Sequence, residues 1–250
     1  MIHFVMKAKS SVDEIRARFD ADVERFSNLE TGQKATIDAP LAMELITVAA
    51  AACNPNAKAV LDIGCGAGNN TLKLLDRLQS QGRPAREVEW VLLDLSHPML
   101  DRAEERVRKA GGTQLKTVQG DLREARLQER HFDVILAAAV LHHLREDADW
   151  EAAFQKIFQL LAPGGSFWVT DLVAHEGATI HGMMWKRYGD YLEQTGGPEY
   201  RDKVFAYVEQ EDSPRSLTYQ IELMKRVGFT EIDVLHKNSS FAAFGGRKRS

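Results

Sequence analysis

The sequence predicts a doubly wound α/β fold, in which a mostly parallel sheet of seven strands carries helices on both faces. Apolar runs of strand length alternate with segments of helical periodicity between residues 59 and 171. Such alternation favours parallel βαβ units. A glycine-rich turn separates the first strand of this series from its first helix. With 250 residues, 44% of them hydrophobic, the chain is long enough for one large domain with its own core.

Seven strands are expected, five of them in the alternating part of the chain. These five cover residues 59–63, 88–94, 115–119, 132–139 and 166–171. Helices are expected between them at 69–80, 97–110 and 147–161, with a short turn or helix after residue 121. The helix over 147–161 should end sharply, because Pro163, Gly164 and Gly165 follow it. Strands at 230–236 and 240–246, expected to pair antiparallel, complete the sheet.

Helices are also expected outside the alternating region. Residues 11–26 and 36–52 have apolar side chains at helical spacing, and Ser11 with Glu14 matches a capping box. Residues 1–10 are expected to form a loose start. Beyond the fifth strand the alternation stops, and helices are expected over 183–192, 200–208 and 214–227, with Gly196-Gly197-Pro198 between the first two.

The composition excludes several classes of protein. Lys and Arg number 32 against 36 Asp and Glu, a net charge of −4, so binding to nucleic acid driven by charge is not expected. Cys53 and Cys65 form neither a disulfide framework nor a zinc pattern, and we expect no metal. No apolar run would span a bilayer, and residues 1–6 lack the length of a signal peptide core. We therefore expect a cytoplasmic monomer or homodimer without a membrane partner.

The glycine turn indicates which ligand the fold holds. Its pattern is D-x-G-x-G-x-G, formed by Asp62, Gly64, Gly66 and Gly68, with Cys65 packed inside it. Glycines allow the backbone to approach a ligand at a helix N-terminus. A dinucleotide fingerprint would require its third glycine at position 69, where this chain has asparagine. An acid at the end of the strand suits a cation better than a pyrophosphate.

At this turn the sequence resembles motif I of the class I S-adenosylmethionine (SAM)-dependent methyltransferases. Further motifs similar to those of the family follow in the same order: Asp94-Leu-Ser-His-Pro-Met-Leu100, Gly120-Asp121-Leu122, Phe132 to Leu144, and Leu160 to Gly165. The resemblance implies a Rossmann-like fold with an α-helical lid, and an enzyme that converts SAM to S-adenosyl-L-homocysteine. In such folds the ligand lies beyond the carboxyl ends of the strands, where the strand order reverses.

The same resemblance implies cofactor contacts. Asp94 also ends the second strand, where a doubly wound nucleotide site places its ribose-binding carboxylate. In the family, Leu95 packs on the adenine, Asp121 accepts from the adenine amine, and the carbonyl of Ala137 faces the SAM ammonium. The residues expected to bind the cofactor are Asp62, Gly64, Cys65, Gly66, Gly68, Asp94, Leu95, Met99, Gly120, Asp121, Leu122, Ala137 and Ala138.

His142 and His143 begin the loop that lies beside the methyl group in the family. A histidine there could act as a general base, because its pKa lies near neutrality. The alternative is that one of the pair packs on the cofactor without taking part in chemistry. A hydroxyl acceptor would need such a base, whereas a carbon or amine nucleophile might not.

The chain is expected to form a single domain over residues 1–250, with two segments near the ligand. Residues 1–55 provide N-terminal helices over the cofactor site, and residues 174–213 form a helical lid. Trp185 and Tyr188 could line an aromatic acceptor pocket, and Arg201 could bind an anionic group. The alternatives are that the aromatic residues pack with one another and that Arg201 lies on a solvated helix face.

The flanks also resemble the carboxy-SAM synthases that serve tRNA wobble-uridine modification. The similar stretches are Phe19–Phe26, the long insertion, Asp212-Ser213 and Phe241–Gly246. Those enzymes hold a carboxylated SAM through an arginine of the insertion, for which Arg201 is the nearest candidate. The turn here keeps the common G-C-G-A-G form, so methyl transfer to a small-molecule acceptor is the main prediction. Carboxy-SAM synthesis, tRNA modification and non-catalytic SAM binding are the alternatives.

Overall fold

The computed structural model describes residues 9–250 and contains a seven-stranded sheet in the order β3-β2-β1-β4-β5-β7-β6. The first five strands run parallel, and β7 pairs antiparallel with both β5 and β6. The predicted fold class is confirmed. The strands are β1 (Ala59–Ile63), β2 (Glu89–Asp94), β3 (Leu115–Gln119), β4 (Phe132–Ala138), β5 (Leu161–Leu172), β6 (Thr230–Asn238) and β7 (Phe241–Arg247). The strand order reverses between β1 and β4, which is where doubly wound sheets bind ligands.

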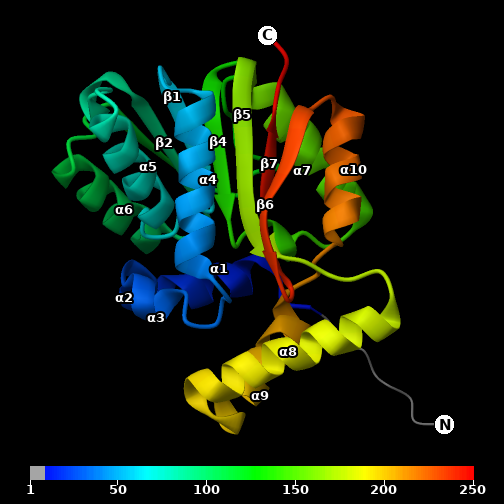
Figure 1. Ribbon diagram of the computed structural model, residues 1–250. Helices are drawn as coiled ribbons and strands as arrows, with labels where there is room; N and C mark the ends of the chain where they lie inside the picture. The colour runs from blue at the N-terminus through cyan, green and yellow to red at the C-terminus, as the bar shows by residue number, and fades with distance from the viewer. Residues whose placement is uncertain (1–8) are drawn as a thin grey trace.

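Helices cover both faces of the sheet (Figure 1). On one face lie α4 (Ala39–Cys53), α5 (Asn69–Ser80) and α6 (His97–Lys109), and on the other α7 (Asp147–Leu160) and α10 (Leu217–Val227). Side chains of a strand alternate between faces, so Leu61 and Ile63 belong to one buried core and Val60 to the other. Two cores, one per face, hold the parallel strands rigidly.

A second group of helices lies at the end of the sheet where the parallel strands finish (Figure 1). It comprises α1 (Val12–Ala21), α2 (Val23–Ser27), α3 (Leu29–Gly32), α8 (Ala178–Gly196) and α9 (Pro198–Glu211). Two short 3₁₀ helices, η1 (Ala85–Glu87) and η2 (Leu141–His143), precede β2 and follow β4. Among the described residues, no helix combines the length and the apolarity that crossing a membrane requires.

The N-terminal predictions hold in outline. The expected helix over residues 11–26 is divided at Asp22 into α1 and α2, and the capping box of Ser11 and Glu14 is present. The second helix begins at Ala39 rather than at residue 36, because Asp38 before it has a left-handed φ of 56°. Most of the expected loose start, residues 1–8, lies outside the described residues.

The expected start of the fifth strand, at residue 166, needs correction. β5 begins at Leu161, directly after α7, and residues 162–165 form a bulge within the strand. Leu161 pairs with Phe132 and Ser166 with Val134, so residues 162–165 lie opposite a single residue of β4. A Cβ on Gly165 would lie 2.8 Å from the carbonyl oxygen of Phe132, which explains the glycine. The two glycines therefore shape a bulge in the sheet.

Candidate functional site

The three glycines of the turn after β1 serve different purposes. All have positive φ: 63° at Gly64, 50° at Gly66 and 81° at Gly68. A Cβ on Gly64 would lie 2.5 Å from Cγ2 of Val140, so this glycine lets the chain leaving β4 pass close to the turn. A Cβ on Gly66 would meet no atom within 4 Å. Gly66 therefore presents bare backbone to open space, as a ligand-binding turn requires.

Asp62 is buried at the end of β1, with one of its carboxylate oxygens unsatisfied. Its Oδ2 accepts a hydrogen bond from Oγ1 of Thr71 at 2.5 Å, which joins the strand to α5. Oδ1 has no hydrogen-bond partner among residues 9–250. Burial raises the pKa of Asp62 to about 7, although the hydrogen bonds from Thr71 oppose this. A cationic or N–H-bearing ligand nearby would complete the environment of this oxygen.

Asp94 joins the end of β2 to the glycine turn. Its Oδ2 accepts from the backbone N–H of Gly66 at 2.8 Å, and its Oδ1 accepts from the backbone N–H of Ser96 at 2.9 Å. Burial raises the pKa of Asp94, against the effect of these backbone hydrogen bonds. Each oxygen retains a second lone pair for a ligand hydroxyl. Cys65, inside the turn, is buried, and burial raises its thiol pKa, so it is an inert packing residue.

The remaining expected cofactor residues lie along the same edge with different exposure. Leu95 and Ala138 are half-buried, and Gly120 has open space where a Cβ would be. The buried members are Met99, Leu122 and Ala137.

Asp121 already has a strong partner. Its Oδ1 accepts from Nε of Arg123 at 3.0 Å and its Oδ2 from Nη2 at 2.7 Å. Burial would raise the pKa of Asp121, but Arg123 holds it below its usual value. An adenine amine at this position would have to share the carboxylate with Arg123, a residue that the sequence analysis missed.

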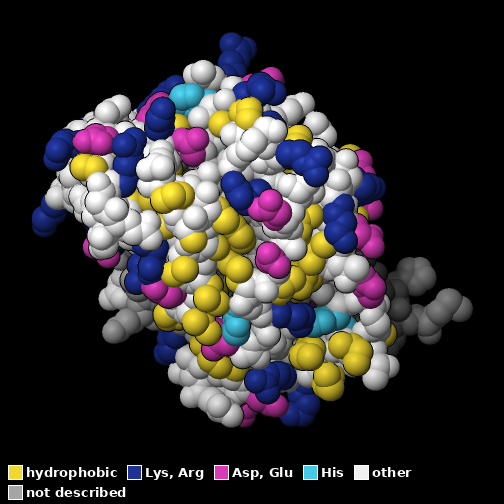
Figure 2. Space-filling model, turned by 45° about the horizontal axis from the view of Figure 1, so that its top comes forward, with side chains coloured by type: hydrophobic (Ala, Val, Ile, Leu, Met, Phe, Trp, Pro, Cys, Tyr) yellow, Lys and Arg dark blue, Asp and Glu magenta, His cyan; other side chains and the backbone are white. Residues whose placement is uncertain are grey.

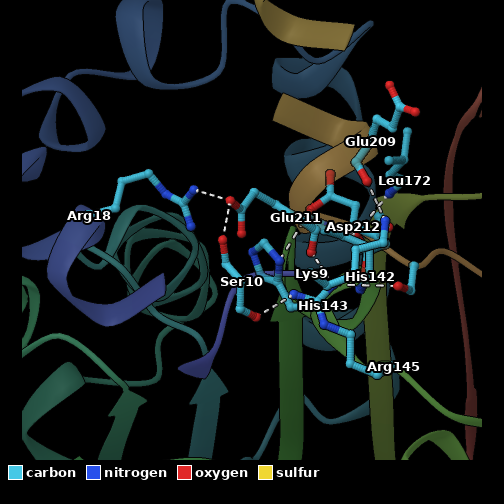
Figure 3. Close-up of polar contacts among 12 residues, drawn as sticks. Lys9, Ser10, Arg18, His142, His143, Arg145, Leu172, Glu209, Glu211 and Asp212 are labelled. Atoms are coloured by element: carbon cyan, nitrogen blue, oxygen red, sulfur yellow. Dashed lines mark hydrogen bonds and ion pairs between the residues drawn. The ribbon is translucent and has the colours of Figure 1, made fainter. Parts of the chain in front are cut away.

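His142 lies between two carboxylates, one of which, that of Asp212, is labelled beside it in Figure 3. Its Nδ1 pairs with Oδ1 of Asp171, its backbone N–H donates to Oδ2 of Asp171 at 3.1 Å, and its Nε2 lies 3.6 Å from Oδ1 of Asp212. Burial alone would lower the pKa of His142, but the two carboxylates outweigh it and raise the pKa to about 9. His142 is therefore an imidazolium at neutral pH and has no lone pair to accept a proton.

His143 has the opposite electrostatic environment. Its Nδ1 lies 3.2 Å from Oδ1 of Asp212. Its ring packs edge-on against the ring of Phe19 of α1, with the ring centroids 6.0 Å apart. Burial and the charge of His142 lower the pKa of His143, although Asp212 opposes them. His143 is thus neutral near pH 7. Of the two predicted catalytic histidines, it is the one whose ring retains a lone pair.

The acidic end of the lid helix α9 is fastened to this cluster. Glu211 pairs with Nη1 of Arg18 at 2.7 Å and accepts from Oγ of Ser10 at 2.7 Å. Arg145 donates to the backbone carbonyls of Glu211 and Ser10. Figure 3 shows these side chains converging from α1, the segment after β4, and α9. The lid end is therefore bound to both the sheet edge and the N-terminal helices.

The sequence analysis missed the acids of this cluster as site residues. Asp171 lies near the end of a parallel strand, the position that singled out Asp62 and Asp94, so the same rule would have found it. Asp212 follows a helix and carries no such local signal. His142, His143 and Asp212 form a group of side chains whose potential ligand atoms lie within 4.8 Å of one another.

The lid residues follow the packing alternative. The ring of Trp185 stacks on Phe205 with centroids 4.7 Å apart, and buried Tyr188 donates its hydroxyl hydrogen to the carbonyl of Ala35 at 2.9 Å. Arg201 is paired with Glu193 at 2.6 Å and with Asp202 at 2.9 Å.

Two surface cavities border the lid. One of about 650 Å³ lies between α8 and residues 237–239, and one of about 370 Å³ lies between α8 and residues 37–38. Their lining residues do not include the glycine turn. We therefore place the candidate site at the turn and the histidine cluster, where the buried polar groups lie, rather than in these cavities.

Comparisons with known proteins agree with this architecture. The methyltransferase domain family matches residues 60–165. The carboxy-S-adenosyl-L-methionine synthase of Shewanella sp. (strain W3-18-1) is 26% identical over 191 residues, which cover 76% of this chain and 75% of that protein. Human N-acetylserotonin methyltransferase in complex with SAM superposes with a TM-score of 0.60 at 15% identity, over 96% of this chain and 58% of that one. The DhpI–SAH complex superposes with a TM-score of 0.61 at 16% identity, over 95% of this chain and 97% of that one.

Proposed function

The chain belongs to the class I SAM-dependent methyltransferases and uses SAM, and on this premise we propose that it methylates a small-molecule acceptor. SAM supplies a methyl group on a sulfonium, an electrophile strong enough for direct displacement by a nucleophile. The enzyme's task is then alignment and exclusion of water. The observation that carries the proposal is the bare backbone of Gly66, which has open space at its Cβ position and donates its N–H to the carboxylate of Asp94.

The proposed cofactor contacts follow from this geometry. Asp62 offers its unsatisfied Oδ1 to a donor of the methionine part, and Asp94 offers its remaining lone pairs to the ribose hydroxyls. Gly120, whose Cβ position is also open, leaves room beside Asp121 for the adenine. Leu95 and Ala138 contribute half-buried surface at the same edge.

We also propose how the flanks serve the site. The chain forms one SAM-binding domain in which residues 1–55 cover the cofactor and residues 174–213 close over the acceptor. α1 and α2 pack against α6, and Asn69 of the turn donates to the carbonyl of Phe26 at 2.9 Å. His143 would accept a proton from a hydroxyl acceptor. His142 would position His143 and Asp212 rather than take part in chemistry, since it is charged. A cytoplasmic location and a monomeric or dimeric state remain predictions.

Carboxy-SAM synthesis is the second candidate, because a relative of that activity is similar over three quarters of the chain. Arg201 does not favour it, because the carboxylates with which it pairs, Glu193 and Asp202, belong to the lid itself. The tRNA-modifying alternative is not favoured by the face of the molecule in Figure 2. On the face shown in Figure 2, Lys and Arg side chains lie among Asp and Glu side chains. Large basic areas would be expected for binding RNA.

The test is calorimetry with SAM and S-adenosyl-L-homocysteine on three proteins: wild type, Gly66→Ala and Gly82→Ala. Gly66 and Gly82 both have positive φ and open space at the Cβ position, but Gly82 lies at the far end of α5. We expect Gly66→Ala to weaken SAM binding roughly tenfold or more, about 1.4 kcal/mol, and Gly82→Ala to change it by less than about twofold. Absence of binding by the wild type would contradict the proposal.

Mass spectrometry of the ligand released from the purified protein separates the candidate functions. SAM or S-adenosyl-L-homocysteine, together with turnover of an acceptor, supports methyl transfer. A carboxylated SAM that remains bound through purification supports the synthase. Binding of SAM without turnover of any acceptor in a broad panel would favour the non-catalytic alternative.

A further inference from the structure

We propose that His142, His143 and Asp212 bind a divalent transition-metal ion of the Zn²⁺ or Fe²⁺ class at the junction of the sheet and the lid. Two histidine nitrogens and one carboxylate oxygen form this group, with all three atoms within 4.8 Å of one another. Within residues 9–250, no other three histidine, cysteine or acidic side chains lie close enough together to hold an ion. The composition of the chain gave no reason to expect a metal.

The separations of the ligand atoms match those around a bound ion. Oδ1 of Asp212 lies 3.2 Å from Nδ1 of His143 and 3.6 Å from Nε2 of His142. Zinc binds histidine nitrogen at about 2.0–2.1 Å and carboxylate oxygen at about 2.0–2.2 Å, so neighbouring ligands of a tetrahedral ion lie about 3.3 Å apart. Small shifts of the side chains would therefore bring all three atoms to bonding distance of one ion. On binding, the ion would displace the Nε2 proton of the charged His142 to solvent.

The cluster contains buried polar atoms without hydrogen bonds. Oδ1 of Asp212 and Nδ1 of His143 are both buried, and Asp212 is 5% exposed. The two atoms face each other at 3.2 Å, but neither makes a hydrogen bond within residues 9–250. The side chains of Lys9 and Arg145 do not satisfy them. Lys9 and Arg145 donate to backbone carbonyls of residues 209–212 instead of to this carboxylate oxygen. Buried polar atoms of native proteins are normally hydrogen-bonded, and an ion bound between these two atoms would satisfy both.

A carboxylate behind the cluster orients one ligand. Nδ1 of His142 pairs with Asp171, which turns Nε2 of the same ring toward Asp212. Histidines that bind metals usually make such a contact through their other ring nitrogen. Two imidazole nitrogens select transition metals over Mg²⁺ and Ca²⁺, which prefer oxygen ligands.

The position of the site implies a consequence for the lid. The histidines belong to η2, directly after β4, and Asp212 caps the C-terminus of α9. An ion held by all three would cross-link the lid to the sheet edge and, with three protein ligands, would keep a coordination position for another molecule. Binding of the ion does not depend on the acceptor. It excludes the general-base role of His143 while the ion is bound, because coordination through Nδ1 leaves Nε2 of the neutral ring protonated.

The test titrates the full-length protein, stripped of metal with a chelator, with Zn²⁺, Co²⁺ and Mg²⁺. We expect one Zn²⁺ or Co²⁺ per chain, visible absorption bands from bound Co²⁺, and no comparable affinity for Mg²⁺. Zn²⁺ at a hundredfold excess over its Kd should raise the melting temperature by about 5–10 °C.

Variants locate the site. His143→Gln and Asp212→Asn should each weaken Co²⁺ binding more than about tenfold, and Asp171→Asn by about 10–100-fold through loss of orientation. The matched control is His131→Gln, since His131 also pairs with a carboxylate, Glu89 at 2.7 Å, away from the cluster. SAM binding by the same samples reports folding. Retained SAM binding with substoichiometric metal, or equal Co²⁺ affinity in all variants, would overturn this inference without affecting the proposed function.

Discussion

The glycine turn and the histidine cluster both contain buried carboxylates, but the partners of these carboxylates differ between the two regions. Asp62 and Asp94 accept hydrogen bonds from Thr71 and from backbone N–H groups of the turn and of the start of α6. Asp171 and Asp212 face two imidazole rings and lie on separate elements, β5 and a helix cap of the lid. The turn is thus a local device, and the cluster joins distant parts of the chain. Substitutions should affect the two regions with different strength.

The largest effect is expected from breaking the cluster. Asp171→Ala leaves the ring and the backbone N–H of His142 buried without their acceptor. The free energy of unfolding should fall by about 3–5 kcal/mol, as when one partner of a buried ion pair is removed. Urea denaturation measures it. The control, Glu89→Ala, removes the acceptor of the partly exposed His131 and should cost less than about 1 kcal/mol. Equal losses would show that the cluster does not differ from a surface pair.

The next effect concerns the packing of the turn. Gly64→Ala places a Cβ 2.5 Å from Val140 on a residue whose φ is 63°. Clash and left-handed strain together should lower the free energy of unfolding by about 2–4 kcal/mol. In Gly82→Ala only the strain is present, at φ 86°, and the free energy of unfolding should fall by about 1 kcal/mol. Denaturation of both variants checks the difference, and similar losses would mean that Val140 yields without cost.

A smaller effect should depend on pH through Asp62. The folded pKa is about 7, above the unfolded value of about 3.9, so the native state retains a proton that the unfolded chain has lost. The free energy of unfolding should therefore fall by about 1–3 kcal/mol as pH rises from 4 to 7, and level off above. In Asp62→Asn, whose amide oxygen still accepts from Thr71, this part of the pH dependence should be absent. Identical pH profiles for the two proteins would refute the shift.

The smallest effect is expected at the lid. Arg201→Ala removes a guanidinium that is paired with Glu193 and Asp202. The Kd for SAM should change by less than about twofold, since these partners lie within the lid, and calorimetry measures it. A loss of tenfold or more, or loss of a carboxylated ligand that copurifies with the wild type, would place Arg201 in the ligand site.

Much of the cofactor edge could be predicted because its signals are contiguous in the sequence. The strand, the three glycines and the helix lie within residues 59–80, and the acid at the end of β2 follows the same strand-end rule. The lid helices were also found, with their break at Gly196-Gly197-Pro198. Their orientation was not, because periodicity shows that Trp185 and Tyr188 share a helix but not that they pack on Phe205 and Ala35.

The sequence by itself determined the succession of strands and helices, the need for glycine after β1 and the resemblance to the SAM-dependent methyltransferases. These depend on side-chain periodicity and backbone sterics, which act over a few residues. Only the tertiary structure decided that His142 is charged and His143 neutral. That difference arises from Asp171 and Asp212, which are distant in the chain. It also arises from burial, which strengthens the electrostatic interactions among these side chains.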